Sequence, residues 1–239
     1  MTDYLWLRAQ APFAAYRYFQ AGSYRATMPI IPPSAALGLI LNIAAIEMRE
    51  SVDSCVTLQI RKDIPHLCLA IGTVNFTQTV TCKLYQQLQS YPVGTSGKEL
   101  KAYVHGQKYW IVPVKREILV DLDLVIGIRN PEDWLVERIQ QGLAGEFNTE
   151  RYGLPFAGDN NLLFDRIDLI ESPPEETQWY AQMQSNDSPR EGSCRLTVGI
   201  DRADNSKTTK FLYAPVSASN YPLEEAWTWT PKQPDAVKI

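Results

Sequence analysis

The order of apolar and polar positions predicts a chain in which strands and helices alternate around one core. Asp3–Ala11 alternates bulky apolar residues with polar ones, which is typical of a strand. Residues 35–49 carry apolar side chains at every third or fourth position, and this spacing predicts a helix. Three more apolar runs are expected to be strands, namely Val56–Asp63, His66–Val74 and Ile118–Ile128.

A proline-rich segment leads to the first helix. Pro12–Pro33 is expected to be an extended loop, because a proline disfavours helical backbone in the residue before it. Ser34 follows at the position where a side chain caps a helix N-terminus. The apolar run Leu37–Ile46 contains Asn42 and is too short to cross a bilayer.

A second helix is predicted in residues 130–145. Asn130 is the expected N-cap, and Gly142 or Gly145 is expected to end the helix. Beyond it the pattern changes to short strands and polar loops. Arg195–Arg202 and Lys210–Val216 are expected to be strands joined by a polar turn.

Residues 77–117 interrupt the core pattern with three glycines and little continuous apolar character, so a long β-hairpin or projection is expected there. Residues 1–145 then follow the order β-α-β-β-β-α with this arm inserted. That order favours an α+β fold with a ferredoxin-like core, in which two helices cover one face of a four-stranded antiparallel sheet. Residues 146–239 are expected to form a small, mostly-β extension packed on this domain.

The distribution of charge changes what the composition implies. The chain has 239 residues, 45% of them apolar, and a net charge of −4, which by itself argues against nucleic-acid binding. Residues 1–120, however, carry 12 Lys and Arg against 7 Asp and Glu, whereas residues 121–239 carry 11 against 20. The halves are thus +5 and −9, which indicates a nucleic-acid surface on the first half, an internal scheme of salt bridges or a chance split.

Two basic, aromatic stretches carry the positive charge. The first lies in the predicted arm, where lysines that attract phosphate alternate with tyrosines that stack on bases. A solvated hairpin, or an arm that binds an acidic partner protein, would have the same composition. The second stretch contains Arg8, Arg17 and Arg25 among several tyrosines, and leads to the helix start at Ser34, whose backbone amides would form an anion site.

Signatures of enzymes and cofactors are weak. No phosphate-binding or dinucleotide motif occurs, no cofactor is expected, and the four cysteines and two histidines lack metal-ligand spacing. His105 lies near Tyr103 and Lys108, a combination suited to cleaving RNA without metal, but a polar loop histidine at a turn is the preferred interpretation. Arg151–Asp168 is rich in turn residues and is interpreted as a structural loop. Reduced cysteines and the lack of a secretory signal favour the cytoplasm.

Three stretches together resemble a known family. "APFAAYR", followed by "YRATMPIIPPSAALGLILNIA", is similar to the N-terminal signature of the CRISPR-associated family-five (Cas-five) subunit. "KREILVDLDLVIGI" resembles the strand that follows the thumb of that family. "RYGLPFAGDNNLLFDRI" is similar to its DevS-type (MYXAN) branch, which is associated with type I-B-like systems. The resemblance covers most of residues 4–168.

This resemblance implies a RAMP protein with an RRM-like core and a thumb at about Thr77–Glu117. Such a subunit of a type I Cascade complex grips the 5′ handle of the CRISPR RNA and caps the backbone filament. Its expected partners are the backbone subunit (Cas family seven), the PAM-reading large subunit (Cas family eight) and, indirectly, target DNA near the PAM. The chain is expected to be non-catalytic, and a metal-independent endoribonuclease that processes precursor RNA is the alternative.

The RNA-binding residues that the resemblance implies fall into two groups. The N-terminal group is Arg17, Tyr24, Arg25, Pro33 and Ser34. The thumb group is Lys83, Lys98, Lys101, His105, Lys108, Tyr109, Lys115 and Arg116. Neither the handle sequence nor the PAM follows from the sequence, and the choice between interference and RNA-guided transposition stays open.

Overall fold

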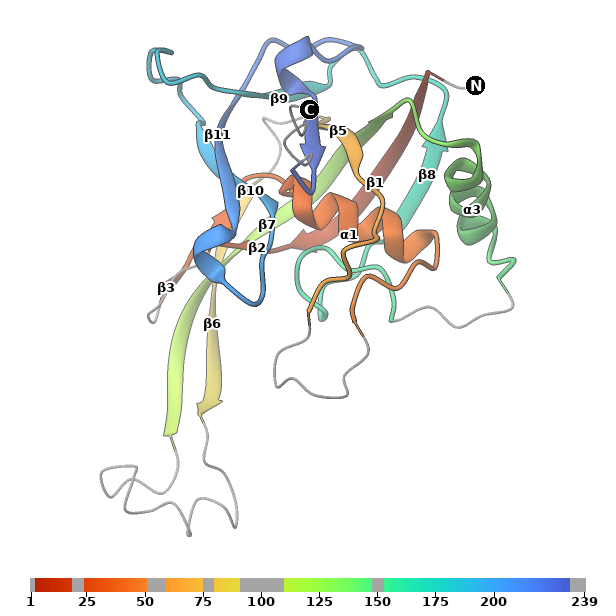
Figure 1. Cartoon of the computed structure of the whole chain (residues 1–239). Helices are drawn as coiled ribbons and strands as arrows, with labels where there is room; N and C mark the ends of the chain where they lie inside the picture. The colour runs from red at the N-terminus through yellow and green to blue at the C-terminus, as the bar shows by residue number, and fades with distance from the viewer. Residues whose placement is uncertain are drawn as a thin grey trace.

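The computed structural model of the chain describes residues 3–18, 24–50, 59–74, 80–90, 110–147 and 153–232, with the backbone alone for 80–90 and 110–114. Within these residues, a ten-stranded sheet runs in the order β10-β11-β9-β5-β7-β1-β8, with β12 paired to β5 and with β3 and β6 paired to β7 (Figure 1). Its strands are β1 (Tyr4–Ala14), β3 (Tyr24–Arg25), β5 (Leu67–Thr73), β6 (Val80–Ser90), β7 (Trp110–Arg129), β8 (Arg166–Ile170), β9 (Gln178–Gln182), β10 (Cys194–Gly199), β11 (Thr209–Pro215) and β12 (Thr228–Thr230).

The predicted order of elements over the first part of the chain agrees with the structure except for one strand. The described residues of Val56–Asp63 form no strand, and β6 lies in the predicted arm. Strand β1 is followed by α1 (Pro33–Ile43), then by β5, β6 and β7, and then by α3 (Asp133–Ala144). At the centre of the sheet, β5, β7, β1 and β8 are neighbours and every pair is antiparallel. The predicted loop before α1 contains β3 and a two-stranded sheet of β2 (Tyr16–Arg17) and β4 (Thr27–Met28).

The prediction for the first helix was wrong at both ends. Helix α1 begins at Pro33, with Pro32 as N-cap and no side-chain cap, so Ser34 lies inside the first turn. A proline fits this first position because its fixed φ is helical and its missing N–H has no partner there anyway. The helix ends at Ile43 rather than near residue 49. The amides of Ala45 and Ile46 close the end by donating to the carbonyls of Asn42 and Leu41, and Ala45 takes a φ of 51°.

The second helix starts later than predicted and ends where predicted. Glu132 is the N-cap of α3, while Asn130 lies in the turn after β7 with a φ of 47°. Gly145 ends the helix in the left-handed conformation, with a φ of 73°. Gly142 lies inside the helix, where a Cβ would be 1.9 Å from the carbonyl oxygen of Ile43, so this glycine lets α3 approach α1 closely.

The remaining strand predictions were mostly confirmed. His66–Val74 contains β5, and the pair predicted around residues 195–216 is β10 and β11, with a one-turn helix η3 (Asn205–Lys207) between them. Val56–Asp63 was predicted as a strand, but its described residues 59–63 form only a single bridge, between Ile60 and Arg49. Residues 56–58 lie outside the described part of the chain.

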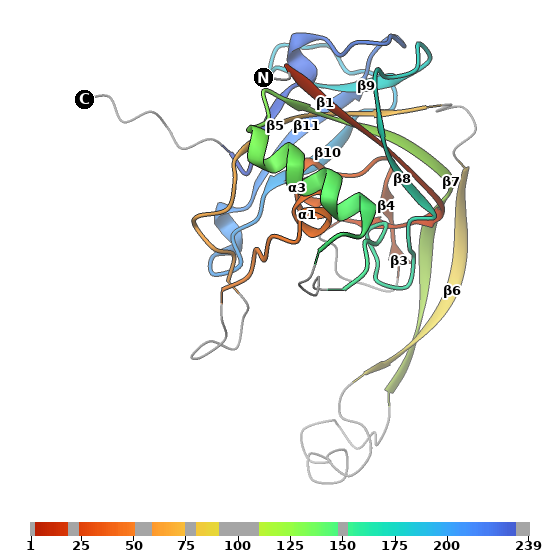
Figure 2. The same cartoon turned by 90° about the vertical axis from the view of Figure 1, so that its right-hand side faces the viewer.

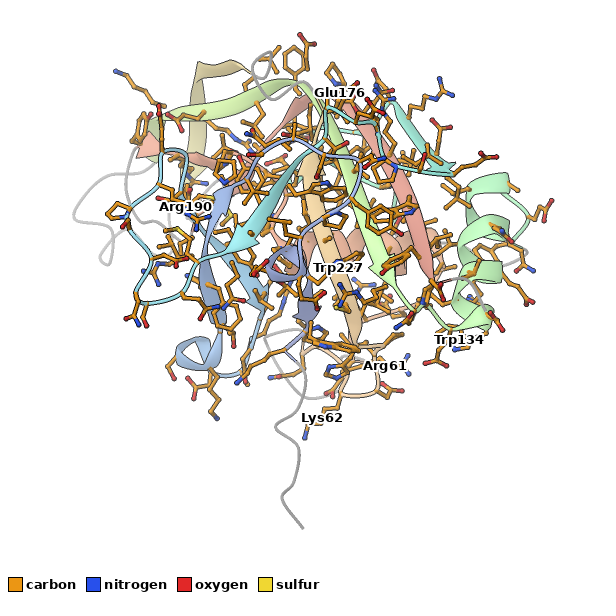
Figure 3. All side chains as sticks on the ribbon, turned by 90° about the horizontal axis from the view of Figure 1, so that it is seen from above. Arg61, Lys62, Trp134, Glu176, Arg190 and Trp227 are labelled. Carbon is orange, nitrogen blue, oxygen red and sulfur yellow. The ribbon has the colours of Figure 1, made fainter. Side chains whose placement is uncertain are left out.

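The sheet is covered on both faces, because successive side chains of a strand point to opposite sides. Alternate residues of β1, such as Leu5 and Leu7, belong to the larger core cluster together with residues of α1 and α3. Both helices lie on this side of the sheet (Figure 2). Trp6 points the other way, into a second cluster with Val125 and Trp179. The segment around Trp227 lies over this second face, where Trp227 packs near Trp6 (Figure 3).

A two-stranded ribbon extends away from the body of the molecule (Figures 1 and 2). Its strands are β6 and the first half of β7, which pair antiparallel from Val80 opposite Val120 to Ser90 opposite Trp110. These strands occupy the predicted arm, and residues 91–109 between them lie outside the described residues. Where the ribbon meets the sheet, Asp121 has a φ of 55° and the pairing of β1 with β7 skips this residue.

Candidate nucleic-acid interface

The base of the ribbon is where the predicted N-terminal residues meet the predicted thumb residues. Strand β3 pairs parallel with β7, with Tyr24 opposite Lys115 and Arg25 opposite Arg116. On its other edge, the same part of β7 pairs with β6. The parallel pairing therefore joins two candidate segments that are about ninety residues apart in the sequence.

A single buried carboxylate holds two of the predicted arginines at this place. The Nη2 atoms of Arg17 and Arg116 both donate to Oδ2 of Asp159, at 2.7 Å and 2.5 Å. The other oxygen, Oδ1, accepts the backbone N–H and the side-chain Nδ2 of Asn161, each at 3.0 Å. Asp159 is only 3% exposed, so it acts inside the protein and joins β2, β7 and the loop before β8.

Gly158 explains how Asp159 reaches this position. Its φ is +82°, and a Cβ there would lie 2.4 Å from the carbonyl oxygen of Ala15 and 2.6 Å from Cδ1 of Tyr16. The neighbouring Ala157 accepts a hydrogen bond from the amide of Ala15 at 2.9 Å. The loop therefore lies directly against the backbone after β1, as only glycine allows at this point. The tight turn expected here is confirmed. The side chains that donate hydrogen bonds to the carboxylate of Asp159 were not predicted.

The pKa of Asp159 reflects two opposing effects. Burial favours the neutral acid and raises the pKa, but the hydrogen bonds from Asn161, Arg116 and Arg17 favour the carboxylate more strongly. The net result is a pKa held well below the ordinary value of an aspartate. Asp159 is therefore charged throughout the physiological pH range.

Glu117 forms a second link at the base of the ribbon. It accepts a hydrogen bond from the hydroxyl of Tyr24 through Oε1, and one from the backbone N–H of Thr27 at 3.2 Å through Oε2. The hydrogen bond to Glu117 raises the pKa of Tyr24 above its usual value. Glu117 thus ties the segment that contains β3 and β4 to β7.

The cations at this place differ in their access to solvent. The side chain of Arg17 is 48% exposed, Lys115 is exposed and Arg25 is half-buried, whereas the side chain of Arg116 is only 10% exposed. Among the described residues, no carboxylate forms an ion pair with Arg25 or Lys115. Four cations and the two carboxylates Asp159 and Glu117 leave the surface with a net positive charge, which suits a phosphate backbone.

The other predicted site residues are placed as follows. Pro33 is buried and Ser34 is half-buried at the start of α1. Pro33 has no N–H, and the amides of Ala35 and Ala36 donate to the carbonyl oxygen of Pro32. Within the described residues, this leaves Ser34 with the one first-turn amide that has no backbone acceptor, so the predicted anion site there is small.

Most of the thumb group lies outside the described residues. Lys83 pairs with Glu117 in the β6–β7 ladder, as backbone only. The remaining predicted residues of the arm lie outside the described residues, and they are Lys98, Lys101, Tyr103, His105, Lys108 and Tyr109. The described residues contain no group of three or more His, Cys, Asp or Glu side chains that could hold a metal ion, and no helix among them is long and apolar enough to cross a membrane.

Comparison with known proteins identifies the family. A family model described as CRISPR-associated protein (Cas_Cas5) matches residues 4–143, which is more than half of the chain. The chain belongs to this family. The matched region contains β1, α1, the ribbon strands β6 and β7, and nearly all of α3. Asp159 lies beyond it.

The chain shares its fold with a solved structure. The chain is similar to one in a structure described as a CRISPR RNA-guided surveillance complex, with a TM-score of 0.58, 13% identity and coverage of 90% of each chain. A structure described as the crystal structure of a Cas protein matches with a TM-score of 0.46 and 13% identity over 91% of this chain and 95% of the other. No curated protein matches the chain.

Two functional candidates were missed from the sequence, namely Asp159 and Glu117. Asp159 stands 142 residues from Arg17 and 43 from Arg116, and no local spacing connects them. The "GDNN" motif indicated a turn in which a side chain bonds the backbone, but not that the second carboxylate oxygen would bind two arginines. Glu117 was the last residue of the predicted thumb and was counted only as part of its boundary.

Proposed function

We propose that this member of the CRISPR-associated protein (Cas_Cas5) family is a non-catalytic, RNA-binding subunit of a type I Cascade complex. It grips the 5′ handle of the CRISPR RNA and caps the backbone filament beside the PAM-reading large subunit. Family membership and the fold shared with a chain of a CRISPR RNA-guided surveillance complex support a place in such a complex. The partners proposed are those that the sequence resemblance implied, and the I-B-like branch and the cytoplasmic location belong to the same proposal.

One observation carries the RNA-binding part of the proposal. The parallel pairing of β3 with β7 places Tyr24 and Arg25 beside Lys115 and Arg116, at the base of a projecting ribbon. Cations and an aromatic side chain at the junction of a ribbon and a sheet form a corner that suits a single-stranded RNA, by ion pairing with phosphate and stacking on bases. Arg17 adds a third exposed or half-exposed cation to this corner.

The proposal also includes a ferredoxin-like core, a thumb and a division into two domains. The order β5-β7-β1-β8, with α1 after β1 and α3 after β7, is the arrangement expected of a ferredoxin-like (RAMP) core. The β6–β7 ribbon is the thumb. Residues 1–145 would form this first domain with its thumb at about 77–117, and residues 146–239 the mostly-β extension.

The endoribonuclease alternative rests on Tyr103, His105 and Lys108, all of which lie outside the described residues. Incubation of repeat-derived RNA with the full chain and EDTA tests it. Sharp cleavage that His105→Ala abolishes would support the nuclease and contradict a non-catalytic role.

RNA binding is tested with the double variant Arg25→Ala, Lys115→Ala of the full chain. We expect weaker binding to a labelled repeat-derived RNA, and a salt dependence of log K that is shallower by about 0.7 for each lost phosphate contact. The matched control is Arg202→Ala, Lys207→Ala, which removes the same charge next to β10 and β11. Equal loss in both variants, or no loss in the first, would contradict the proposed surface.

A further inference from the structure

We infer that Asp159 is a positioning residue for the RNA site: it fixes the guanidinium of Arg17 toward the bound phosphate, with Arg116 as an internal brace. This inference rests on the proposed function, since it assigns roles within the same surface. It separates two arginines that the sequence treated alike, one of which contacts RNA while the other does not.

The two arginines differ in exposure although they share one acceptor atom. Both donate an Nη2 hydrogen to Oδ2 of Asp159, but the side chain of Arg17 is 48% exposed and that of Arg116 only 10%. The Nε of Arg116 is also buried and has no hydrogen-bond partner among the described residues, so this guanidinium lies inside the protein rather than at its surface. Of the two arginines, only Arg17 combines an anchor inside the protein with a side chain that is about half exposed.

The anchor itself is held rigidly. Oδ1 of Asp159 is occupied by two donors of Asn161, and Gly158 presses the loop against Ala15 and Tyr16. With four donors around its two oxygens and 2% of its side chain exposed, Asp159 has no capacity left to contact RNA itself. Its contribution to binding must therefore act through Arg17.

Fixing an arginine before binding has a measurable effect. A long side chain that is ordered only on binding weakens the complex, and one that is ordered beforehand avoids this loss. The guanidinium fork also gains its geometric specificity for phosphate only when its plane is held. The ion pair to Asp159 supplies this restraint and still leaves the group positively charged.

The positioning role and simple electrostatics predict opposite effects of Asp159→Asn on RNA affinity. Asp159→Asn removes a negative charge close to the proposed RNA site, so charge alone predicts tighter RNA binding. Positioning predicts weaker binding, because Arg17 loses the partner that orders it. We expect the affinity of the full chain for a labelled oligouridylate of about 15 nucleotides to fall about two- to tenfold.

A double-mutant cycle shows whether Asp159 acts through Arg17. In the background Arg17→Ala, we expect Asp159→Asn to change the affinity by less than about twofold, because the group it would position is absent. An equal loss in both backgrounds would show that Asp159 acts by another route and would overturn the inference.

A milder variant protects the test against misfolding, since Asp159→Asn leaves the buried Arg116 beside a neutral partner. Arg17→Lys changes an exposed residue, keeps its charge and removes the planar fork. We expect weaker binding with an unchanged salt slope, whereas a merely electrostatic role of Arg17 predicts no change. Thermal unfolding of each variant reports separately whether it is folded.

The outcomes distinguish the inference from the proposed function. If the wild-type chain binds RNA and Asp159→Asn binds it equally or more tightly, with Arg17→Lys unchanged, the positioning role is overturned while the proposed function stands. If the wild-type chain binds neither the oligouridylate nor a repeat-derived RNA at any salt concentration, the proposed function fails and the inference fails with it.

Discussion

Trp6 and Gly127 are partners across the centre of the sheet, and the indole of one fills the space where the other has no side chain. A Cβ at Gly127 would lie 2.3 Å from Cζ3 of Trp6 and 3.1 Å from Cη2 of Trp227. Trp6 is buried, so its ring has no room to move aside. The packing of the tryptophans on the second face of the sheet therefore requires a residue without a side chain at position 127.

Gly127→Ala should lower the free energy of unfolding by about 1–3 kcal/mol, because the added methyl overpacks this face. Gly38→Ala is the matched control, since Gly38 lies inside α1 and a Cβ there would approach nothing closer than Sδ of Met48 at 3.9 Å. That change should raise the free energy of unfolding by about 0.5–1 kcal/mol. Urea denaturation measures both, and a similar effect of the two substitutions would contradict the packing described.

Ala45→Gly should stabilise the protein by up to about 1 kcal/mol. Ala45 closes α1 with a φ of 51°, a conformation that is unfavourable for residues with a Cβ and free of strain in glycine. Ala45→Val is the paired control, because a β-branched residue suits this conformation least and should destabilise the protein. Thermal unfolding of both variants checks the prediction, which would be wrong if valine were tolerated as well as glycine.

Acid should weaken the fold through Asp159. Its pKa is lowered in the folded state, mainly by hydrogen bonds that outweigh burial, so the unfolded chain binds the proton more readily. The resulting stability is fully present above the ordinary aspartate pKa of about 3.9 and is lost as the pH falls toward the lower folded value. Urea denaturation at several acidic pH values should show a smaller acid dependence in Asp159→Asn than in the wild type. Asp165→Asn removes an exposed carboxylate of the same segment as control.

The buried cysteines should resist alkylation while the protein is folded. Burial raises the pKa of Cys194 to about 12 and also raises that of Cys68, so both thiols stay protonated and enclosed near neutral pH. Treatment with iodoacetamide followed by peptide mass spectrometry should leave both unmodified, and prior unfolding in urea should make both reactive. Rapid modification of Cys194 in the folded chain would contradict its burial in the larger core cluster.

The elements that were predicted well are those with a strong periodic signal. The apolar runs of β1, β5 and β7 and the turn between β10 and β11 were found in the expected places, and Gly145 ended α3. The ends of α1 were missed for identifiable reasons. A proline served as N-cap where a serine was expected, and an alanine took the left-handed position that normally indicates glycine.

The residues of the candidate site could be predicted from the sequence. Which of them are buried, and which pair with one another, could not. The sequence indicated Arg17, Arg25 and Arg116 through their charge and aromatic neighbours. It did not show that Arg116 would be buried, because that depends on the long-range ion pair with Asp159. Partners separated by more than forty residues are brought together by the register of β3 on β7 and by the loop at Gly158, and neither is encoded in a local pattern.

Strand β7 lies at the centre of the sheet and also forms one side of the ribbon. On one of its edges the partner changes from β6 to β5 between Val120 and Leu124. In evolution, the length of the ribbon can therefore change without a change in the direction in which it projects. Adding two residues to each ribbon strand would extend it by about 7 Å and leave every core contact and side-chain face unchanged. Its direction has no such freedom, because it is set by backbone that also pairs with β1 and β5.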